Sequence, residues 1–404
     1  MTHDELNMKK IMVGKNFVLA ERADIGSARK LMEKYTFGDQ AIAEIVFVNG
    51  YFEPELSRLE ELPKGIKVMV ANWGETEAIG DDSMKEFVED IGRLCMGINF
   101  EDKRDKERDR VIIDVDRGVL CKRPIHLMFL TVVPPPRQSD DQMDVVAASF
   151  PKVWMGADEN SECSIVETYA GDEGGGEYLT HTTTTISLSE SAKVDYYKLQ
   201  QEGAEASHVA EQNVFTGAKS SFASHSISLG SKLTRNELNV TFCGEGAKAT
   251  LNGLVIAGDE QRIDNHTLLY HQVENCASQE LYKHVLDGKA KVGFEGKICV
   301  LKDAQKTDSK LASKSLVLTD EACMEAKPEL EIYADDVKCS HGATSGPVDE
   351  NAVFYLVSRG LSLEQARHLM TYAFAADVTR RIRVAAVRER VERLLAERYG
   401  LPEE

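Results

Sequence analysis

The sequence is poor in aromatic residues and contains no long apolar run. Phe, Trp and Tyr make up 7% of its 404 residues, so an aromatic-rich sugar-binding cleft is not indicated. No apolar run reaches the ~18 residues of a membrane-spanning helix, and we expect no membrane contact. The chain has 48 Lys and Arg against 67 Asp and Glu, a net charge of −19. Such an acidic chain is not expected to bind nucleic acid, which requires clustered cations.

The sequence also lacks the short motifs of several enzyme classes. It has no Gly-x-x-x-x-Gly-Lys-Ser/Thr run for a nucleotide, no Gly-x-Ser-x-Gly elbow and no His-Glu-x-x-His helix. The run Gly174–Gly176 lies between acidic residues, which would repel a phosphate. We therefore expect no enzyme with its own ATPase site; if the protein works with ATP, another subunit supplies that site.

The cysteines and the N-terminus indicate a cytoplasmic protein. None of the eight cysteines forms a Cys-x-x-Cys pair, so reduced thiols are expected in place of a disulfide framework or a self-contained zinc or iron–sulfur site. The first residues, Met1–Asn7, have neither the basic nor the apolar region of a signal peptide. The length predicts two or three structural units.

Residues 1–110 give mixed signals, and we interpret them as an N-terminal α/β or helical domain. A short helix is predicted over Ile25–Tyr35, and Ile45–Val48 followed by Asn49-Gly50 predicts a strand and a turn. A second helix is predicted over Ser83–Met96. The charged run Glu101–Arg110 has no apolar periodicity and is interpreted as a solvated linker.

Residues 111–346 are rich in short β-forming runs. Leu238, Val240 and Phe242 alternate with Asn239 and Thr241, which is the pattern of a half-buried strand. Such runs recur every ten to twelve residues or so, without helix-length periods between them. A sandwich, a barrel and a solenoid all fit this pattern. The length of the region and the even spacing of its turns favour the solenoid.

From residue 347 to 404 the pattern becomes helical. Asp349 lies where a helix begins and Gly360 where one ends. Ser362 and Gln365 then form a predicted capping box. Seven arginines make the last turns basic: Arg380, Arg381, Arg383, Arg388, Arg390, Arg393 and Arg398. This basic helical end is either a solvated face or a docking surface for an acidic partner groove.

Cys339 and His341 are the candidate chemical site. Residues i and i+2 of a strand point to the same face, so the thiol and the imidazole would project together. Sulfur and imidazole ligands suit iron, zinc or copper. Two ligands do not complete a metal site, so others would come from elsewhere in the fold or from another subunit. The small residues Gly342–Gly346 leave this strand open to another chain. The alternative is a buried structural thiol beside a hydrogen-bonded histidine.

Several motifs resemble one protein family. These are Glu331–Thr344, with Phe354-Tyr355-Leu356 and Ser358-Arg359-Gly360 after it, and Leu281–Ala290, with Gly296-Lys297-Ile298 and Ala304–Asp308 after it. The set resembles the SufD subunits of SufBCD iron–sulfur cluster assembly complexes. The resemblance is dense from about Val111 to Ala376 and thinner before that.

The resemblance implies a mainly β fold with a right-handed parallel β-helix over residues 111–346. It implies a non-catalytic scaffold that pairs with SufB through the β-helix and seats the SufC ATPase on the C-terminal helical domain. The residues expected to contact partners there are Phe354, Tyr355, Arg359, Leu369 and Phe374.

The resemblance also assigns roles to the candidate pair. His341 corresponds to a histidine at the contact with SufB and is expected to be an iron ligand for a transient iron–sulfur cluster shared between the two chains. Cys339 is the second candidate. A flavin remains an option at the level of the complex, and no tightly bound cofactor is expected on the isolated chain. SufB-like chains have a cysteine where this sequence has Ser313, so the resemblance is to SufD and not to SufB.

Two other functions stay open at this point. The first is a β-solenoid enzyme that acts on carbohydrate with paired carboxylates, because acidic residues are plentiful. The second is a SufD-like homodimer that acts alone and binds iron weakly.

Overall fold

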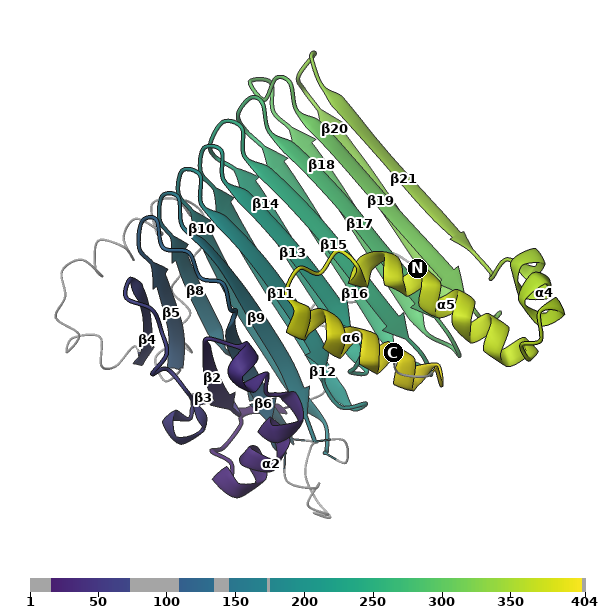
Figure 1. Ribbon diagram of the computed structural model, residues 1–404, viewed down its shortest axis with the longest axis horizontal. Coiled ribbons are helices and arrows are strands. Elements are labelled where there is room, and N and C mark those ends of the chain that lie inside the picture. Colours follow the sequence, from purple (N-terminus) through teal and green to yellow (C-terminus); the bar gives the residue numbers. More distant parts are fainter. Residues whose placement is uncertain (1–15, 73–108, 134–144, 173–174, 402–404) are drawn as a thin grey trace.

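The chain folds into a parallel β-solenoid of about seven turns (Figure 1). The computed structural model describes residues 16–72, 109–133, 145–172 and 175–401. Each turn contributes one strand to each of two sheets that enclose the core. The predicted mainly β solenoid is therefore confirmed.

The first sheet has eleven strands. They are β1 (Asn16–Leu19), β4 (Ile66–Asn72), β5 (Asp109–Val115), β7 (Val145–Ser149), β8 (Lys152–Ala157), β10 (Tyr178–Leu188), β12 (Ala206–Thr216), β14 (Leu233–Phe242), β16 (Arg262–His271), β18 (Lys291–Val300) and β20 (Cys323–Ile332).

The second sheet has ten strands. They are β2 (Ala43–Val48), β3 (Tyr51–Phe52), β6 (Ile125–Thr131), β9 (Glu162–Gly171), β11 (Lys193–Gln201), β13 (Ser221–Ser228), β15 (Lys248–Ala257), β17 (Ala277–Leu286), β19 (Asp308–Val317) and β21 (Lys338–Gly346).

Period-two alternation places the apolar side chains between the sheets. In β14, Leu238, Val240 and Phe242 are buried in the main core, as the sequence predicts. The strands are longer and further apart than expected, since β14 to β18 have ten residues each and begin 14 or 15 residues apart. The predicted spacing of ten to twelve residues was too short because it left little room for the corners that join the two sheets.

The corners on one side of the solenoid repeat the same backbone geometry. One residue in each of six successive corners has a positive φ: Asn160, Ser191, Lys219, Gly246, Asn275 and Lys306. The backbone N–H of each donates to a carbonyl in the corner of the next turn, as from Ser191 to Ala218 (2.8 Å) and from Lys219 to Glu245 (2.8 Å). These bonds stack the turns although the corner sequences have little in common.

The N-terminal elements follow the predictions where the structure describes them. Helix α2 (Ile25–Tyr35) begins at the N-cap Asp24 and has the predicted bounds. Strand β2 is joined to β3 by Asn49 and Gly50, both with positive φ, as a tight hairpin requires. Two short 3₁₀ turns, η2 (Gly38–Gln40) and η3 (Pro54–Leu56), flank this hairpin.

Other N-terminal predictions lie outside the described residues. They are the helix over 83–96 and most of the charged run 101–110. Two described strands of this region, β2 and β4, extend the two sheets of the solenoid by pairing with β6 and β5, and β5 already begins at Asp109, within the end of the predicted linker.

Three C-terminal helices follow the last strand: α4 (Glu350–Ser358), α5 (Leu363–Thr379) and α6 (Ala385–Arg398). Asp349 caps α4, and the predicted capping box of Ser362 and Gln365 begins α5. Figure 1 shows α5 and α6 lying across the outer face of the second sheet. A second apolar core fills this contact and includes Tyr197, Leu254 and Val387. Among the described helices, none has the length and hydropathy needed to cross a bilayer.

Candidate functional site

The solenoid ends at a turn whose two strands each have a free edge. In the described part of the chain, β20 pairs only with β18 and β21 only with β19. The outer edge of each strand therefore presents backbone N–H and C=O groups without a strand partner. Such edges readily accept another strand.

The candidate pair lies on β21 at this open end. Cys339 stands beside Ser309 of β19, and His341 stands beside Leu311. Ser309 and Leu311 are both buried, so their row faces the interior of the solenoid. Cys339 is half-buried against the core, whereas His341 is exposed because no further turn covers it. The pair thus projects from the same face, as the sequence predicts.

Burial affects the chemistry of the Cys339 thiol. Desolvation raises its pKa, a backbone hydrogen bond at Ser309 opposes the shift, and the charge of Asp308 adds to it. The thiol therefore stays protonated near neutral pH, and binding iron through sulfur would release a proton.

The open end does not hold a complete set of metal ligands. Within the described residues there is no group of three or more His, Cys, Asp and Glu arranged to hold a metal ion. Cys339 and His341 thus offer two ligands, and no third ligand of this kind joins them within the described residues. At Gly342 and Gly346 an added Cβ would meet no atom within 4 Å, so β21 has open space for another chain.

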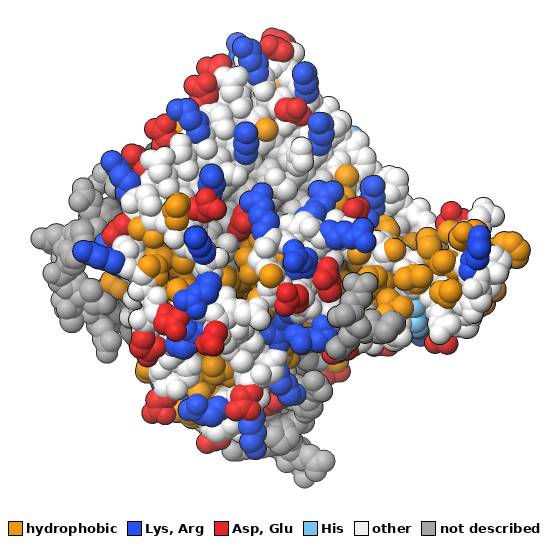
Figure 2. All heavy atoms as spheres, viewed as in Figure 1, with side chains coloured by type: hydrophobic (Ala, Val, Ile, Leu, Met, Phe, Trp, Pro, Cys, Tyr) orange, Lys and Arg blue, Asp and Glu red, His pale blue; other side chains and the backbone are white. Residues whose placement is uncertain are grey.

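Helix α4 carries exposed apolar side chains next to the open end. Phe354 is 75% exposed and Tyr355 is 57% exposed, and Val357 and, at the start of α5, Leu363 are also exposed. Figure 2 shows this apolar group on the part of the molecule that projects furthest from the solenoid, where Figure 1 places α4. Arg359 lies over the Tyr355 ring at 5.1 Å. An exposed apolar group of this kind marks a contact surface for another protein.

Comparison with known proteins identifies the family. Residues 138–374 match the family described as "SUF system FeS cluster assembly, SufBD core domain". The chain belongs to the SufBD family. It is 29% identical to SufD of Escherichia coli over 86% of this chain and 77% of that protein.

Further relatives extend this likeness. A SufBD family protein of Synechocystis is 29% identical over 94% of this chain and 83% of its own length. The chloroplastic protein ABCI7 of Arabidopsis thaliana is 28% identical over 82% of this chain and 69% of its own length. The resemblance to SufD is thereby confirmed, and this chain is a SufBD family protein of iron–sulfur cluster assembly.

The remaining predicted contact residues of this SufBD chain lie on α5. Phe374 is half-buried against the second sheet, where Lys283 lies over its ring at 4.3 Å. The Lys283 ammonium also donates to the Phe374 carbonyl (2.9 Å) and pairs with Asp377 (2.8 Å). This nearly buried lysine ties α5 to the sheet, so Phe374 contributes to the seating of the helix. Leu369 lines a pocket.

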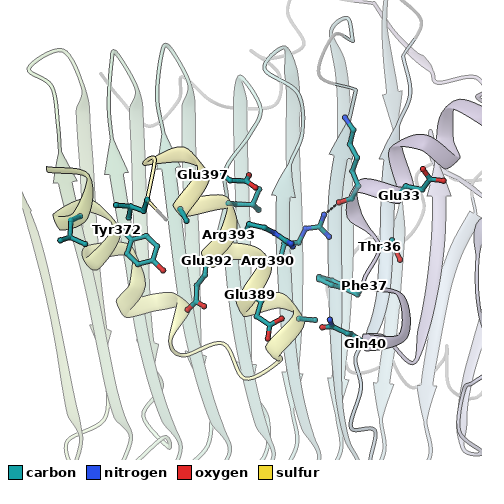
Figure 3. Close-up of a pocket in the computed structure, with 16 residues that line it drawn as sticks. Glu33, Thr36, Phe37, Gln40, Tyr372, Glu389, Arg390, Glu392, Arg393 and Glu397 are labelled. Carbon is teal, nitrogen blue, oxygen red and sulfur yellow. Dashed lines mark hydrogen bonds between the residues drawn. The ribbon is translucent and has the colours of Figure 1, made fainter. Parts of the chain in front are cut away.

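That pocket has a volume of about 860 Å³ and lies between α2, α5 and α6 (Figure 3). Its wall from α2 and the following turn includes Glu33 and Phe37. Its wall from α6 is charged, with Glu389, Arg393 and Glu397 labelled in Figure 3. The lining includes both carboxylates and cationic side chains, so no single ligand charge is favoured.

Arg390 joins the two ends of the chain beside this pocket. It is nearly buried, and its guanidinium donates to the Tyr35 carbonyl (2.6 Å) and to the Lys34 carbonyl. These carbonyls end α2, where a cation also complements the helix dipole. From the sequence, Arg390 was assigned only to a basic tail. Its hydrogen-bond partner lies about 355 residues away and therefore leaves no local signal.

A buried polar network inside the solenoid also escaped the sequence analysis. The Glu167 carboxylate accepts hydrogen bonds from Tyr169 (2.7 Å), Tyr196 (2.5 Å) and Thr184 (2.9 Å). Nearby, the Lys198 ammonium donates to Asn236, and burial lowers the pKa of Lys198 to about 7. Burial raises the pKa of Glu167. The only local sign of this network is that, in strands where apolar and polar residues alternate, some inward positions are polar.

Proposed function

We propose that this chain is a non-catalytic scaffold subunit that builds an iron–sulfur cluster together with a homologous SufB-like chain. The observation that carries the proposal is the open end of the solenoid. There, β20 and β21 each have a free edge, and β21 carries half-buried Cys339 and exposed His341 on its inward row. A homologous solenoid that ends in the same way would pair with these edges and supply the missing ligands.

His341 is the proposed iron ligand of the shared cluster, and Cys339 is the second donor. The cluster is the cargo of the assembly. His341 is exposed at the open end and therefore reaches a partner, whereas Cys339 is half-buried below it. The neutral imidazole and the thiolate both match the ligand preferences of iron.

The C-terminal helices are the proposed seat of a SufC-like ATPase. Exposed Phe354 and Tyr355 on α4, with Arg359 beside them, give an apolar contact with a cation at its rim. Leu369 and Phe374 lie on the neighbouring helix α5, where Leu369 lines the pocket and Phe374 packs against the second sheet. The absence of a nucleotide-binding motif from the sequence agrees with an ATPase supplied by another subunit.

Two other interpretations follow from the same features. The free edges also allow a homodimer, in which two copies would each offer one Cys339 and one His341. Membership of the SufBD family favours cluster assembly over the carbohydrate-active enzyme that the acidic composition left open.

The test is co-expression with SufB and SufC from the same source, for the wild type and for His341→Ala. We expect the wild type and the variant both to enter the complex. In the variant, the amount of iron and sulfide bound per complex should fall by about tenfold or more. Ser340→Ala is the matched control, because Ser340 is exposed on the opposite face of the same strand. Failure of the wild-type chain to enter a complex would overturn the subunit assignment. Unchanged cluster content in His341→Ala would remove His341 from the site.

A further inference from the structure

The outer face of the second sheet is only partly covered by helices. Helices α5 and α6 pack over positions such as Tyr197, Leu254 and Leu281. The first residues of the same strands lie beyond these helices. Lys193, Lys248 and Lys338, for example, are exposed. Figure 2 shows Lys and Arg side chains on this face, with Asp and Glu among them.

The register of the parallel strands brings these lysines into one row. Lys193 of β11 aligns with Ser221, then with Lys248 of β15, and onward through Ala277 and Asp308 to Lys338 of β21. Five strand steps separate the first and last lysine, a span of about 24 Å at the usual strand spacing. Short side chains such as Ser221 and Ala277 stand between the lysines, so the row is flat.

Further cations border the row on the side of the helices. Arg383 pairs with Asp195 of β11 (3.2 Å), which fixes the connection between α5 and α6 beside the row. Lys314 of β19 and Arg381 both act on Asp377 and lower its pKa, after the larger effect of Lys283. We call the whole set the basic face, and its members are Lys193, Lys248, Lys310, Lys314, Lys338, Arg380, Arg381 and Arg383.

The carboxylates on this surface do not neutralise it. Four carboxylates on these strands and on α5 are each engaged in an ion pair, Glu162 with Lys193, Asp308 with Lys310, Asp195 with Arg383 and Asp377 with Lys283. Five cations of the face make no ion pair with any described residue, namely Lys248, Lys314, Lys338, Arg380 and Arg381. Unpaired cations that lie close together repel one another and attract an anionic partner.

We propose that the basic face is a docking surface for an acidic protein segment, distinct from the open end and from α4. The positive charge of the basic face favours an acidic partner. The exposed members of the face are Lys and Arg with no exposed aromatic side chain between them in the register rows, whereas single-stranded nucleic acid requires stacking platforms.

This inference does not depend on the proposed function, but the two fit together. A cluster scaffold must receive iron, sulfur or electrons and must release its product. An acidic protein that delivers these components or collects the product would then have a third surface of its own. It would bind there while the open end and the helices are occupied.

The experiment measures binding of two fluorescent probes to the full chain by anisotropy, a 20-residue polyglutamate peptide and a 20-nucleotide single-stranded DNA. We expect polyglutamate to bind, and Lys248→Glu/Lys310→Glu/Lys338→Glu to weaken it by about tenfold or more, since three charges are reversed. The control Lys30→Glu/Lys122→Glu/Lys291→Glu makes the same change in net charge with exposed lysines elsewhere. It is expected to weaken binding less than about twofold.

Three results would overturn the proposal. One is no binding of polyglutamate by the wild type at low salt. Another is an equal loss in the two triple variants, which would reduce the effect to net charge. The third is tighter binding of DNA than of polyglutamate, with loss in the first triple variant, which would make the face a nucleic-acid site. Lys248→Gln/Lys310→Gln/Lys338→Gln serves as a milder variant, and thermal unfolding checks that each protein is folded.

Discussion

At the scale of single residues, this protein buries several ionisable groups, some between the two sheets and some under the helices that cover the second sheet. Five histidines are buried, and burial lowers the pKa of each; their positions are His126, His208, His225, His271 and His284. The pKa is lowered to about 4 for all but His126. Glu280 opposes this trend, because burial raises its pKa to about 7.

These histidines predict that stability falls in mild acid. Their pKa values in the folded state lie below the unfolded value of 6.5, so the unfolded chain binds more protons between pH 6.5 and 4. Their contribution is complete above pH 6.5 and is lost as the pH falls toward 4. Glu280 acts in the opposite sense, since its contribution is lost as the pH rises toward 7.

His271 allows the clearest test, because burial is the sole cause of its lowered pKa. Its ring stacks on Phe242 at 4.0 Å and its Nε2 bonds Ser278 (3.0 Å). In His271→Leu, the fall of unfolding free energy between pH 6 and pH 4.5 should be shallower by about 1.4 kcal/mol per pH unit. Urea unfolding at several pH values measures this slope. Phe222→Leu is the control: Phe222 is buried in the main core with its ring beside Tyr196, so the substitution should lower stability equally at each pH. A slope unchanged in His271→Leu would contradict the assignment.

At the scale of elements, the corners of the solenoid decide how the turns stack. The corner residues are chemically diverse, yet each of the six adopts a positive φ and donates its N–H to the next corner. The corners share no residue type, because what repeats is a backbone conformation that Asn, Ser, Lys and Gly all adopt here. Equivalent strand positions recur 27 to 31 residues apart, as from Lys193 to Ser221 to Lys248.

Gly246 tests the importance of this corner geometry. Its φ is +74°, so a side chain is strained there even though the nearest atom to an added Cβ, in Lys219, is 3.7 Å away. We expect Gly246→Ala to lower the free energy of unfolding by about 1 kcal/mol, measured by urea unfolding. Gly342→Ala is the control, because its added Cβ meets no neighbour and its φ lies outside the left-handed region. An equal effect of the two substitutions would mean that the corner conformation carries no special cost.

At the scale of the whole molecule, the solenoid offers three surfaces that differ in chemistry. The open end has free backbone edges with a thiol and an imidazole. Helix α4 has exposed aromatic side chains, and the basic face has unpaired cations. Because the three lie on different elements of one rigid scaffold, partners bound to them would be held at fixed relative positions.

The open end predicts how association should respond to substitution. Ala343 is exposed on β21 beside Ser313, in the middle of the free edge. In Ala343→Glu an interface formed there would bury an unpaired carboxylate, so association with the SufB-like chain should weaken by about tenfold or more. Sedimentation velocity measures this effect. Thr241→Glu, on the outer face of the middle strand β14, is the control. If Thr241→Glu weakens association and Ala343→Glu does not, the interface lies on the outer face of the first sheet.

The sequence by itself determined the local elements. Alternation identified the strand that contains Leu238, a cap and periodicity identified Ile25–Tyr35, and the Ser362 capping box marked the start of α5. Each of these follows from neighbouring residues, since backbone hydrogen bonding and side-chain periodicity act over a few positions. The Cys339 and His341 pair was visible for the same reason.

Only the tertiary structure decided which distant residues meet. Lys193 and Lys338 share a row because the turns stack in register, and Arg390 reaches the end of α2 because α6 folds back across the second sheet. The exposure of His341 likewise depends on β21 being the last strand of its sheet. These features depend on register and burial, which arise from contacts between turns and leave no pattern within a short segment of sequence.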